Sequence, residues 1–256
     1  MSNDITNLKE KEYRSLPIES FSSLKALLNS VNEFKYFKIN PFQGNQSTLL
    51  GTAVHNYLQG NKALVFVNDI NRTSKEGKEK YEQLLNNLPE EGIIITKSQD
   101  ETVQEIYKNY LGNTKAVELL NGCLFEVPHV YTINLITGSS IDVKGKVDAV
   151  HPDKGYIVEI KTSGAYSNID EFREGSKQMH YDFQAALYTV MMEDLYKKPF
   201  KHYFIVANTK KPYNVEVYKS GSKYLNDGMT KARKAATLYK DHIIDGLPEE
   251  EIIQEL

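Results

Sequence analysis

The sequence has few of the residues that define several common protein classes. Its single cysteine, Cys123, excludes an internal disulfide framework, a four-cysteine zinc site and an all-cysteine iron–sulfur cluster within one chain. It has no run of about 18 apolar residues that would indicate a membrane-spanning helix. Its first residues lack the charged-then-apolar pattern of a secretory signal. We therefore expect a cytoplasmic protein of a reducing compartment, with no membrane partner.

The sequence also lacks an excess of positive charge. It has 31 Lys and Arg residues against 34 Asp and Glu residues, which gives a net charge of -3. This balance argues against a protein that coats nucleic acid indiscriminately, but it leaves room for a local basic groove. With 40% hydrophobic residues in 256, the chain has enough apolar material for a large core.

The first half of the chain has helical patterns. Apolar residues recur at helical spacing over Ser20–Phe37, which predicts one helix there. We expect a second helix at about Leu49–Gln59, a charged helix ending near Pro89, and a helical pair broken near Gly112. These segments form a predicted helical N-terminal part, about residues 20–120.

The pattern changes at Gly122 to segments with strand composition separated by turn signals. We expect strands near 123–135, 140–150, 155–162, 201–208 and 213–219, and helices near 178–196 and 222–244. The first three strands should be antiparallel. No linker rich in Pro, Gly or Ser interrupts the chain, so we predict a single domain over 1–256 with a core at about 120–245. The fold class is α/β, with a mixed central β-sheet flanked by helices.

An acid-x-Lys triplet ends the strand "GYIVEIKT". The sequence contains four such triplets: Glu33–Lys35, Glu76–Lys78, Asp142–Lys144 and Glu159–Lys161. Only the last one ends a strongly apolar strand. A triplet alone is therefore uninformative, and its meaning depends on which residues lie near it.

The turn "HPDKG" brings a second acid to the triplet. If Pro152 to Gly155 form the loop, His151 faces Tyr156, and the same register sets Asp148 opposite Glu159. Facing residues have Cβ atoms roughly 4.5–5.5 Å apart, so the two carboxylates would repel each other unless a cation lay between them. Oxygen ligands of this kind suit Mg²⁺, which Mn²⁺ can replace. A one-residue slip would separate the acids, and a solvated face with ordinary salt bridges is an equal alternative.

Five further residues could belong to such a site. His180, Gln184 and Tyr188 form one polar stripe of a helix, which could hold a loop, a lysine or a phosphate, or could mark an amphipathic boundary. His55 follows "LLGTAV" on an early helix, where a lone histidine is more often packed than a ligand. Glu126 lies in the apolar strand "CLFEVPHV", where it could support a metal site or face water.

Together, "GTAVH", "GKVDAV", "VEIKT" and "HYDFQAALY" resemble the RecB-like branch of the PD-(D/E)xK nuclease superfamily, especially the RecE-like exonucleases and their phage relatives. The resemblance extends from about Phe21 to Asp245. It implies a restriction-endonuclease-like core in a bacterial or phage-infected cell. Val147 replaces the proline of the superfamily name without removing a ligand. Relatives that carry a four-cysteine cluster are excluded by Cys123.

The resemblance also implies roles for individual residues. It implies metal ligands at His55, Asp148 and Glu159, with the backbone carbonyl of Ile160 completing the shell. It implies that Lys161 orients or activates the attacking water.

In the same family pattern, Gln184 and Tyr188 would position the active-site loop or the DNA backbone. Arg173 and Lys177, which precede that helix, could contact phosphates or could lie in a solvated charged loop. We also consider His180 and Glu126 as accessory residues. A rival motif would use Glu126 with Asp142 and Lys144, one strand earlier.

The expected function is a Mg²⁺-dependent DNA exonuclease acting 5′→3′ on linear double-stranded ends. Its 3′ single-stranded products would serve recombination beside a RecT-like annealing protein, and the resemblance implies a homo-oligomeric ring. An endonuclease on the same scaffold is the alternative. A catalytically inactive DNA-binding protein is disfavoured because His55, Asp148, Glu159 and Lys161 are all present.

Overall fold

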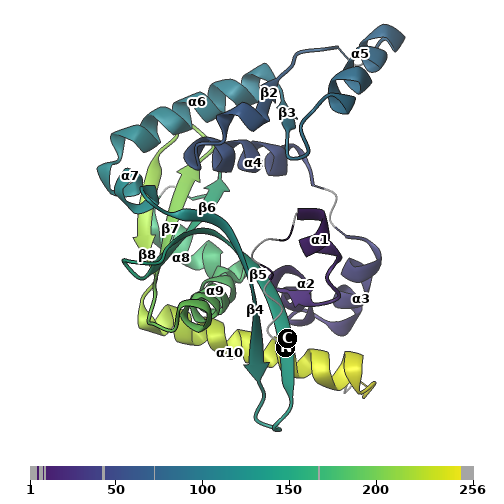
Figure 1. Ribbon diagram of the computed structural model, residues 1–256, viewed down its shortest axis with the longest axis vertical. Coiled ribbons are helices and arrows are strands. Elements are labelled where there is room, and N and C mark those ends of the chain that lie inside the picture. Colours follow the sequence, from purple (N-terminus) through teal and green to yellow (C-terminus); the bar gives the residue numbers. More distant parts are fainter. Residues whose placement is uncertain are drawn as a thin grey trace, which may run out of the picture.

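The computed structural model of the protein describes residues 5, 8, 10–41, 44–71, 73–166 and 168–248 (Figure 1). Its N-terminal part contains α1 (Glu10–Ser15), β1 (Glu19–Ser20), α2 (Phe21–Leu27), α3 (Val31–Ile39), α4 (Gln46–Leu58), a 3₁₀ turn (Lys62–Leu64), β2 (Val65–Val67), α5 (Lys75–Asn86), β3 (Ile93–Ile95), α6 (Lys97–Gly112) and α7 (Thr114–Leu120). The remainder contains β4 (Leu124–Asn134), β5 (Ser140–His151), β6 (Tyr156–Ser163), α8 (Ile169–Gln178), α9 (Tyr181–Tyr196), β7 (Lys201–Asn208), β8 (Val215–Lys219), α10 (Ser222–Leu238) and a π-helical turn (Tyr239–Ile244).

A six-stranded mixed sheet forms the centre of the molecule. Five strands follow the order β1-β5-β6-β7-β8, and β4 pairs with β5 along nearly its whole length, from Ser140 to Val150. The pairs β4–β5, β5–β6 and β7–β8 are antiparallel, whereas β1–β5 and β6–β7 are parallel. The expected mixed sheet and its three antiparallel strands are therefore confirmed.

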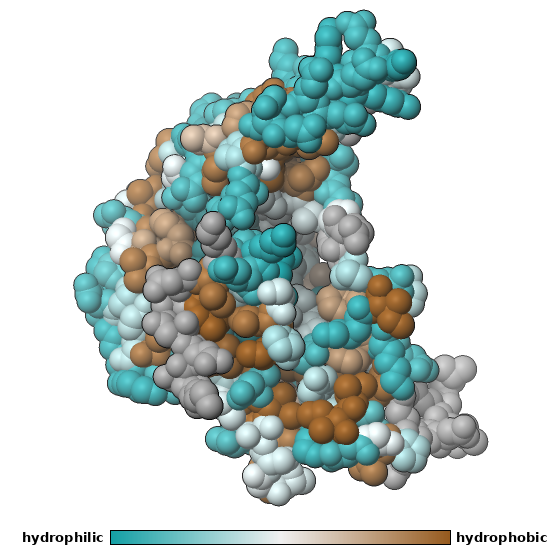
Figure 2. Space-filling model, turned by 45° about the vertical axis from the view of Figure 1, so that its right-hand side comes forward, coloured by the Kyte–Doolittle hydropathy of each residue, from teal (hydrophilic) through white to brown (hydrophobic). Residues whose placement is uncertain are grey.

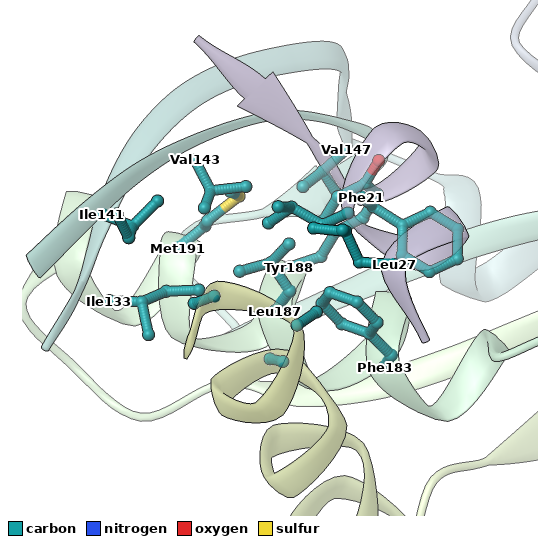
Figure 3. Packing of buried hydrophobic residues seen from close by; sticks show 14 of the residues in the cluster. Phe21, Leu27, Ile133, Ile141, Val143, Val147, Phe183, Leu187, Tyr188 and Met191 are labelled. Atoms are coloured by element: carbon teal, nitrogen blue, oxygen red, sulfur yellow. The ribbon is translucent and has the colours of Figure 1, made fainter. Parts of the chain in front are cut away.

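Helices cover both faces of this sheet (Figure 1). On one face, α9 packs on β4 and β5 together with α2 and α10, and Phe183, Leu187 and Met191 lie in the interior of that layer (Figure 3). The Phe21 and Phe183 rings meet edge to face at 5.2 Å. On the other face, α4, α6 and α7 pack on β6 and β7. The sheet is thus held between two apolar layers.

The helix predicted over Ser20–Phe37 is two helices, α2 and α3. The side chain of Ser30 accepts a hydrogen bond from the backbone N–H of Glu33 and caps the second helix. The cap lets the chain turn while both helices keep their apolar faces on the core. The sequence analysis also missed β2 and β3, a parallel pair of three-residue strands, because such short apolar runs carry little periodicity.

The segment before α9 is a helix and not the charged loop that was one of the expectations. Asn168 accepts hydrogen bonds from the backbone N–H groups of Asp170 and Glu171 and starts α8, so Arg173 and Lys177 lie on a helix rather than in a loop. Among the described residues, no helix is both long enough and apolar enough to cross a membrane.

Candidate metal and catalytic site

The β5–β6 hairpin has the predicted register. Ala149 pairs with Val158, Val150 with Ile157 and His151 with Tyr156. The ladder ends there, so Asp148 and Glu159 do not form the next backbone pair. Instead, Asp148 Oδ2 accepts a hydrogen bond from the backbone N–H of Ile160 at 2.8 Å. The carboxylate of Asp148 is therefore fixed directly to the strand that carries Glu159.

The pleat of β4 and β5 inverts at this point. Val127 and Val147 pair with each other and pack in the α9 layer, whereas Phe125 and Ala149 pair and pack in the α4 layer. Residues two apart on a regular strand point to the same face. Glu126, whose φ is +53°, makes the inversion possible in β4. The register places Glu126 and Asp148 opposite each other at the inversion.

Helix α4 brings His55 to the same place. Gly51 lies so close to β6 that an added Cβ would be 3.0 Å from Thr162 Oγ1. This approach places His55, one turn later, with Nε2 3.1 Å from the Ile160 carbonyl oxygen and Nδ1 3.8 Å from Asp148 Oδ2. Residues 105 positions apart in the sequence therefore meet.

Three side chains form a group that could hold a metal ion. One ligand atom each from His55, Glu126 and Asp148 lies within 4.8 Å of the other two. Two carboxylates and one imidazole are a donor set that suits a hard divalent cation such as Mg²⁺ or Mn²⁺. From the sequence, Glu126 was predicted as an accessory residue or as part of the rival motif with Asp142 and Lys144. The hairpin between β4 and β5 was the available signal, because its register sets Glu126 opposite Asp148.

Glu159 lies beside this group and is held by α9. Its Oε1 accepts hydrogen bonds from Lys161 Nζ at 2.7 Å and from Gln184 Nε2 at 2.7 Å. Lys161 Nζ also donates to Gln184 Oε1 at 2.9 Å, which closes a three-residue ring of contacts. Glu159 Oε2 is buried and has no hydrogen-bond partner. A buried carboxylate oxygen without a partner is costly, so this oxygen also fits a cation ligand.

The charges of the site perturb one another. Burial, with the neighbouring Asp148 carboxylate, raises the pKa of Glu159 to about 7. Burial also raises the pKa of Asp148 to about 7, although the Lys161 cation opposes that shift. Burial lowers the pKa of His55, which favours the neutral, metal-binding imidazole. For Lys161, the Glu159 and Asp148 charges outweigh burial and raise the pKa. Such opposed shifts in one place are typical of functional sites.

The other two residues of the polar stripe, Tyr188 and His180, do not contact Glu159 in the way that Gln184 does. Tyr188 is buried one turn after Gln184, and burial raises the pKa of its hydroxyl well above the ordinary value. An added Cβ at Gly145 of β5 would lie 2.8 Å from Tyr188 Cε1, so the tyrosine ring packs directly on that strand. His180 precedes α9 at φ +57° and its carbonyl accepts a hydrogen bond from the Gln184 N–H. Its Nδ1 is buried without a partner.

Arg173 and Lys177 lie elsewhere. Both line a cavity of about 340 Å³ between α8, β8 and the start of α10. Arg173 pairs with Asp170 on its own helix at 2.5 Å. The structure therefore gives neither residue a contact with His55, Asp148 or Glu159.

The rival motif of Asp142 and Lys144 is not part of this group. Asp142 is exposed and accepts a hydrogen bond from Thr132 Oγ1 at 2.6 Å. Lys144 is buried, and its ammonium donates to backbone carbonyls at the end of α1. Two residues that sequence reasoning missed do contact the site: Gln59 Nε2 donates to Glu126 Oε1 at 3.0 Å, and Lys146 Nζ is 2.8 Å from Glu126 Oε2.

Comparisons with known proteins identify a matching family model and a similar fold. Residues 20–245 match the family model described as a PDDEXK-like domain of unknown function (DUF3799). The fold is similar to the crystal structure of a candidate exonuclease from Eubacterium rectale, with a TM-score of 0.66, 14% sequence identity and coverage of 96% of both chains. A phage-related exonuclease from Haemophilus somnus 129PT also matches, at 14% identity, a TM-score of 0.32, and coverage of 76% of this chain and 93% of that one. The comparison with curated proteins finds no match.

Proposed function

Because the chain belongs to the family of PDDEXK-like domains of unknown function, DUF3799, which its residues 20–245 match, we propose that it is a Mg²⁺-dependent DNA exonuclease. In this proposal it hydrolyses phosphodiester bonds of linear double-stranded DNA in the 5′→3′ direction. The fold shared with the Eubacterium rectale protein supports a nuclease scaffold. The direction of digestion, the single-stranded 3′ product and its use in recombination follow from the RecE-like sequence motifs.

The observation that carries the proposal is the contact ring around Glu159. One oxygen of this buried carboxylate is held by Lys161 and Gln184, while the other has no partner. The charges of Asp148 and His55 both act on this carboxylate, so the group with the unpaired oxygen lies close to them. A bound cation would satisfy that oxygen.

The residues present fit a divalent cation. His55, Asp148, Glu159 and the Ile160 carbonyl oxygen would hold it, with Glu126 as a further oxygen donor. When bound, the ion would lower the pKa of a coordinated water and neutralise charge on the phosphate.

The chain's own groups supply orientation and charge. Lys161 keeps its proton and places a positive charge where the scissile phosphate gains negative charge. Gln184 holds Lys161 and Glu159 in fixed positions from a helix that is itself buried. Tyr188 supports this geometry by packing against β5.

Assembly is part of the proposal. A homo-oligomeric ring would enclose the duplex and would deliver single-stranded DNA to a RecT-like annealing protein. Such a ring could direct basic side chains inward despite the net charge of -3.

The test uses matched DNA substrates with Mg²⁺ and with a chelator. We expect linear duplex to be degraded from its ends in Mg²⁺ and a covalently closed circle to stay intact. Asp148→Asn should abolish degradation. Nicking or linearisation of the circle would favour a structure-specific or restriction-like endonuclease. DNA binding without any cleavage would favour a catalytically inactive binding protein.

A further inference from the structure

Lys146 lies between two carboxylates that are far apart in the sequence, Glu10 in α1 and Glu126 in β4. Its ammonium nitrogen is 2.6 Å from Glu10 Oε2 and 2.8 Å from Glu126 Oε2. Glu126 belongs to the group with His55 and Asp148, whereas Glu10 is the first residue of α1. The ammonium therefore connects the N-terminal helix to the candidate metal site.

Helix α1 is fixed in place by a neighbouring lysine. Lys144 is buried, and its ammonium donates to the carbonyl oxygens of Tyr13, Arg14 and Leu16 at 3.0, 3.1 and 2.8 Å. A cation at this end of a helix also interacts favourably with the helix dipole. Lys144 and Lys146 are two apart on β5, so one strand both anchors α1 and receives its acid.

Both carboxylate oxygens of Glu126 have partners. Gln59 Nε2 binds its Oε1 at 3.0 Å, and Lys146 occupies its Oε2. The Lys146 ammonium therefore competes with any cation for Oε2 and also repels it through like charge. Glu10 opposes both effects, because its carboxylate neutralises Lys146 and contacts the ammonium at 2.6 Å, slightly closer than Glu126 does at 2.8 Å. The remaining Glu10 oxygen is held by Arg14 at 2.6 Å.

We propose that Glu10 is a positioning residue that acts through Lys146 to set the affinity of the Glu126 group for a divalent cation. The inference rests on the proposed function for the presence of a cation. It extends that function by assigning α1 a role in the site rather than in packing alone.

The test measures Mn²⁺ binding directly, without DNA, from the paramagnetic resonance signal of free Mn²⁺. Glu10→Gln removes the charge that draws Lys146 away, so the dissociation constant for Mn²⁺ should rise about three- to tenfold. Glu10 is partly exposed, and its amide replacement keeps the side-chain shape. The melting temperature of each variant reports whether folding is retained. Glu101→Gln, an exposed acid on α6, is the charge-matched control and should bind Mn²⁺ like the wild type.

A double-mutant cycle separates action through Lys146 from a general loss of structure. Lys146→Met removes the competing cation, so Mn²⁺ binding should be at least as tight as in the wild type. In that background, Glu10→Gln should change the dissociation constant by less than about twofold.

An equal weakening by Glu10→Gln in both backgrounds would overturn the inference, as would unchanged binding in the single variant. Both results leave the proposed function standing, since the wild type still binds the ion. A wild type that binds no Mn²⁺ would overturn the proposed function and this inference together.

Discussion

The ammonium of Lys161 donates hydrogen bonds to two oxygens, Gln184 Oε1 from α9 and Glu159 Oε1 from β6. In the wild type, the Lys161 ammonium lies over the Tyr181 ring, 4.6 Å from its centroid. Lys161→Met keeps an aliphatic side chain there but removes the charge. We expect the turnover number to fall by about 10²–10³-fold, the usual loss when one charge-stabilising donor is removed. Steady-state kinetics on linear duplex would measure this loss.

A control variant distinguishes loss of chemistry from loss of folding. Lys234→Met changes an exposed lysine on α10 and should keep full turnover. Lys161→Met should bind DNA and show a helical circular dichroism spectrum like the wild type. Full activity of Lys161→Met would remove this residue from the proposed mechanism.

The two buried acids predict how stability depends on pH. The pKa values of Asp148 and Glu159 are raised from 3.8 and 4.5 to about 7 in the folded, metal-free chain. Because the folded state binds these protons more tightly than the unfolded state, the stabilisation is complete below pH 4 and is lost as pH rises through 7. The metal-free protein should therefore melt at a higher temperature at pH 5.5 than at pH 8. This difference in melting temperature should be larger than the difference measured for the double variant Asp148→Asn, Glu159→Gln.

Addition of Mg²⁺ should reverse this trend. The ion binds ionised carboxylates, so its effect on the melting temperature should be larger at pH 8 than at pH 5.5. Differential scanning calorimetry of both proteins at the two pH values measures the effect. An equal Mg²⁺ shift in the double variant would show that the ion binds elsewhere.

At the scale of elements, the contact between α9 and α10 positions the helix that carries Gln184. A Cβ added at Gly228 of α10 would lie 1.9 Å from the backbone oxygen of Asp182 in α9. Gly228→Ala must therefore separate the two helices and should destabilise the fold by about 1–3 kcal/mol or more. Since α9 carries Gln184, activity should fall as well.

Gly112→Ala is the matched control for that prediction. Gly112 ends α6, and nothing lies within 4 Å of an added Cβ there. Alanine has a higher helix propensity than glycine, so this variant should be neutral or slightly more stable. Urea denaturation of both variants checks the pair. Equal stability of the two would show that the helices tolerate separation.

Elements with local signals were predictable from the sequence. The "HPDKG" turn predicted the β5–β6 register, which the pairing of His151 with Tyr156 confirms. The broken helical pair near Gly112 is also confirmed as α6 and α7. In contrast, the sequence predicts helix interior at the Ser30 cap, because Leu27, Val31 and Phe34 continue the helical apolar spacing on either side of it.

The arrangement at Glu126 could not be predicted in this way. The inverted pleat depends on a left-handed backbone at a non-glycine residue, which tertiary contacts impose and local sequence does not encode. The same is true of Lys146, whose partner Glu10 is 136 residues away. The sequence therefore predicted that His55, Asp148 and Glu159 lie close together, but not that Gln59 and Lys146 contact Glu126.

The whole molecule presents a hollowed side in the space-filling view, with hydrophilic side chains gathered over α5 at its upper rim (Figure 2). A chain of net charge -3 cannot hold a polyanion by its total charge. If the protein binds DNA as proposed, binding must depend on a few local cations. Their contribution weakens with rising salt, because counterions released into a more concentrated solution gain less entropy. A ring that encloses the duplex would add a topological restraint that salt does not weaken.

These two contributions predict different salt dependences. Initial binding to a duplex end should weaken steeply between 50 and 200 mM salt, by about tenfold for two phosphate contacts. The number of nucleotides removed in one binding event should change little, because an enclosed duplex cannot dissociate sideways. Digestion of an end-labelled duplex, started with Mg²⁺ in the presence of a heparin trap, measures that number. If it shortened in proportion to affinity, the protein would hold DNA by charge alone and the ring would be excluded.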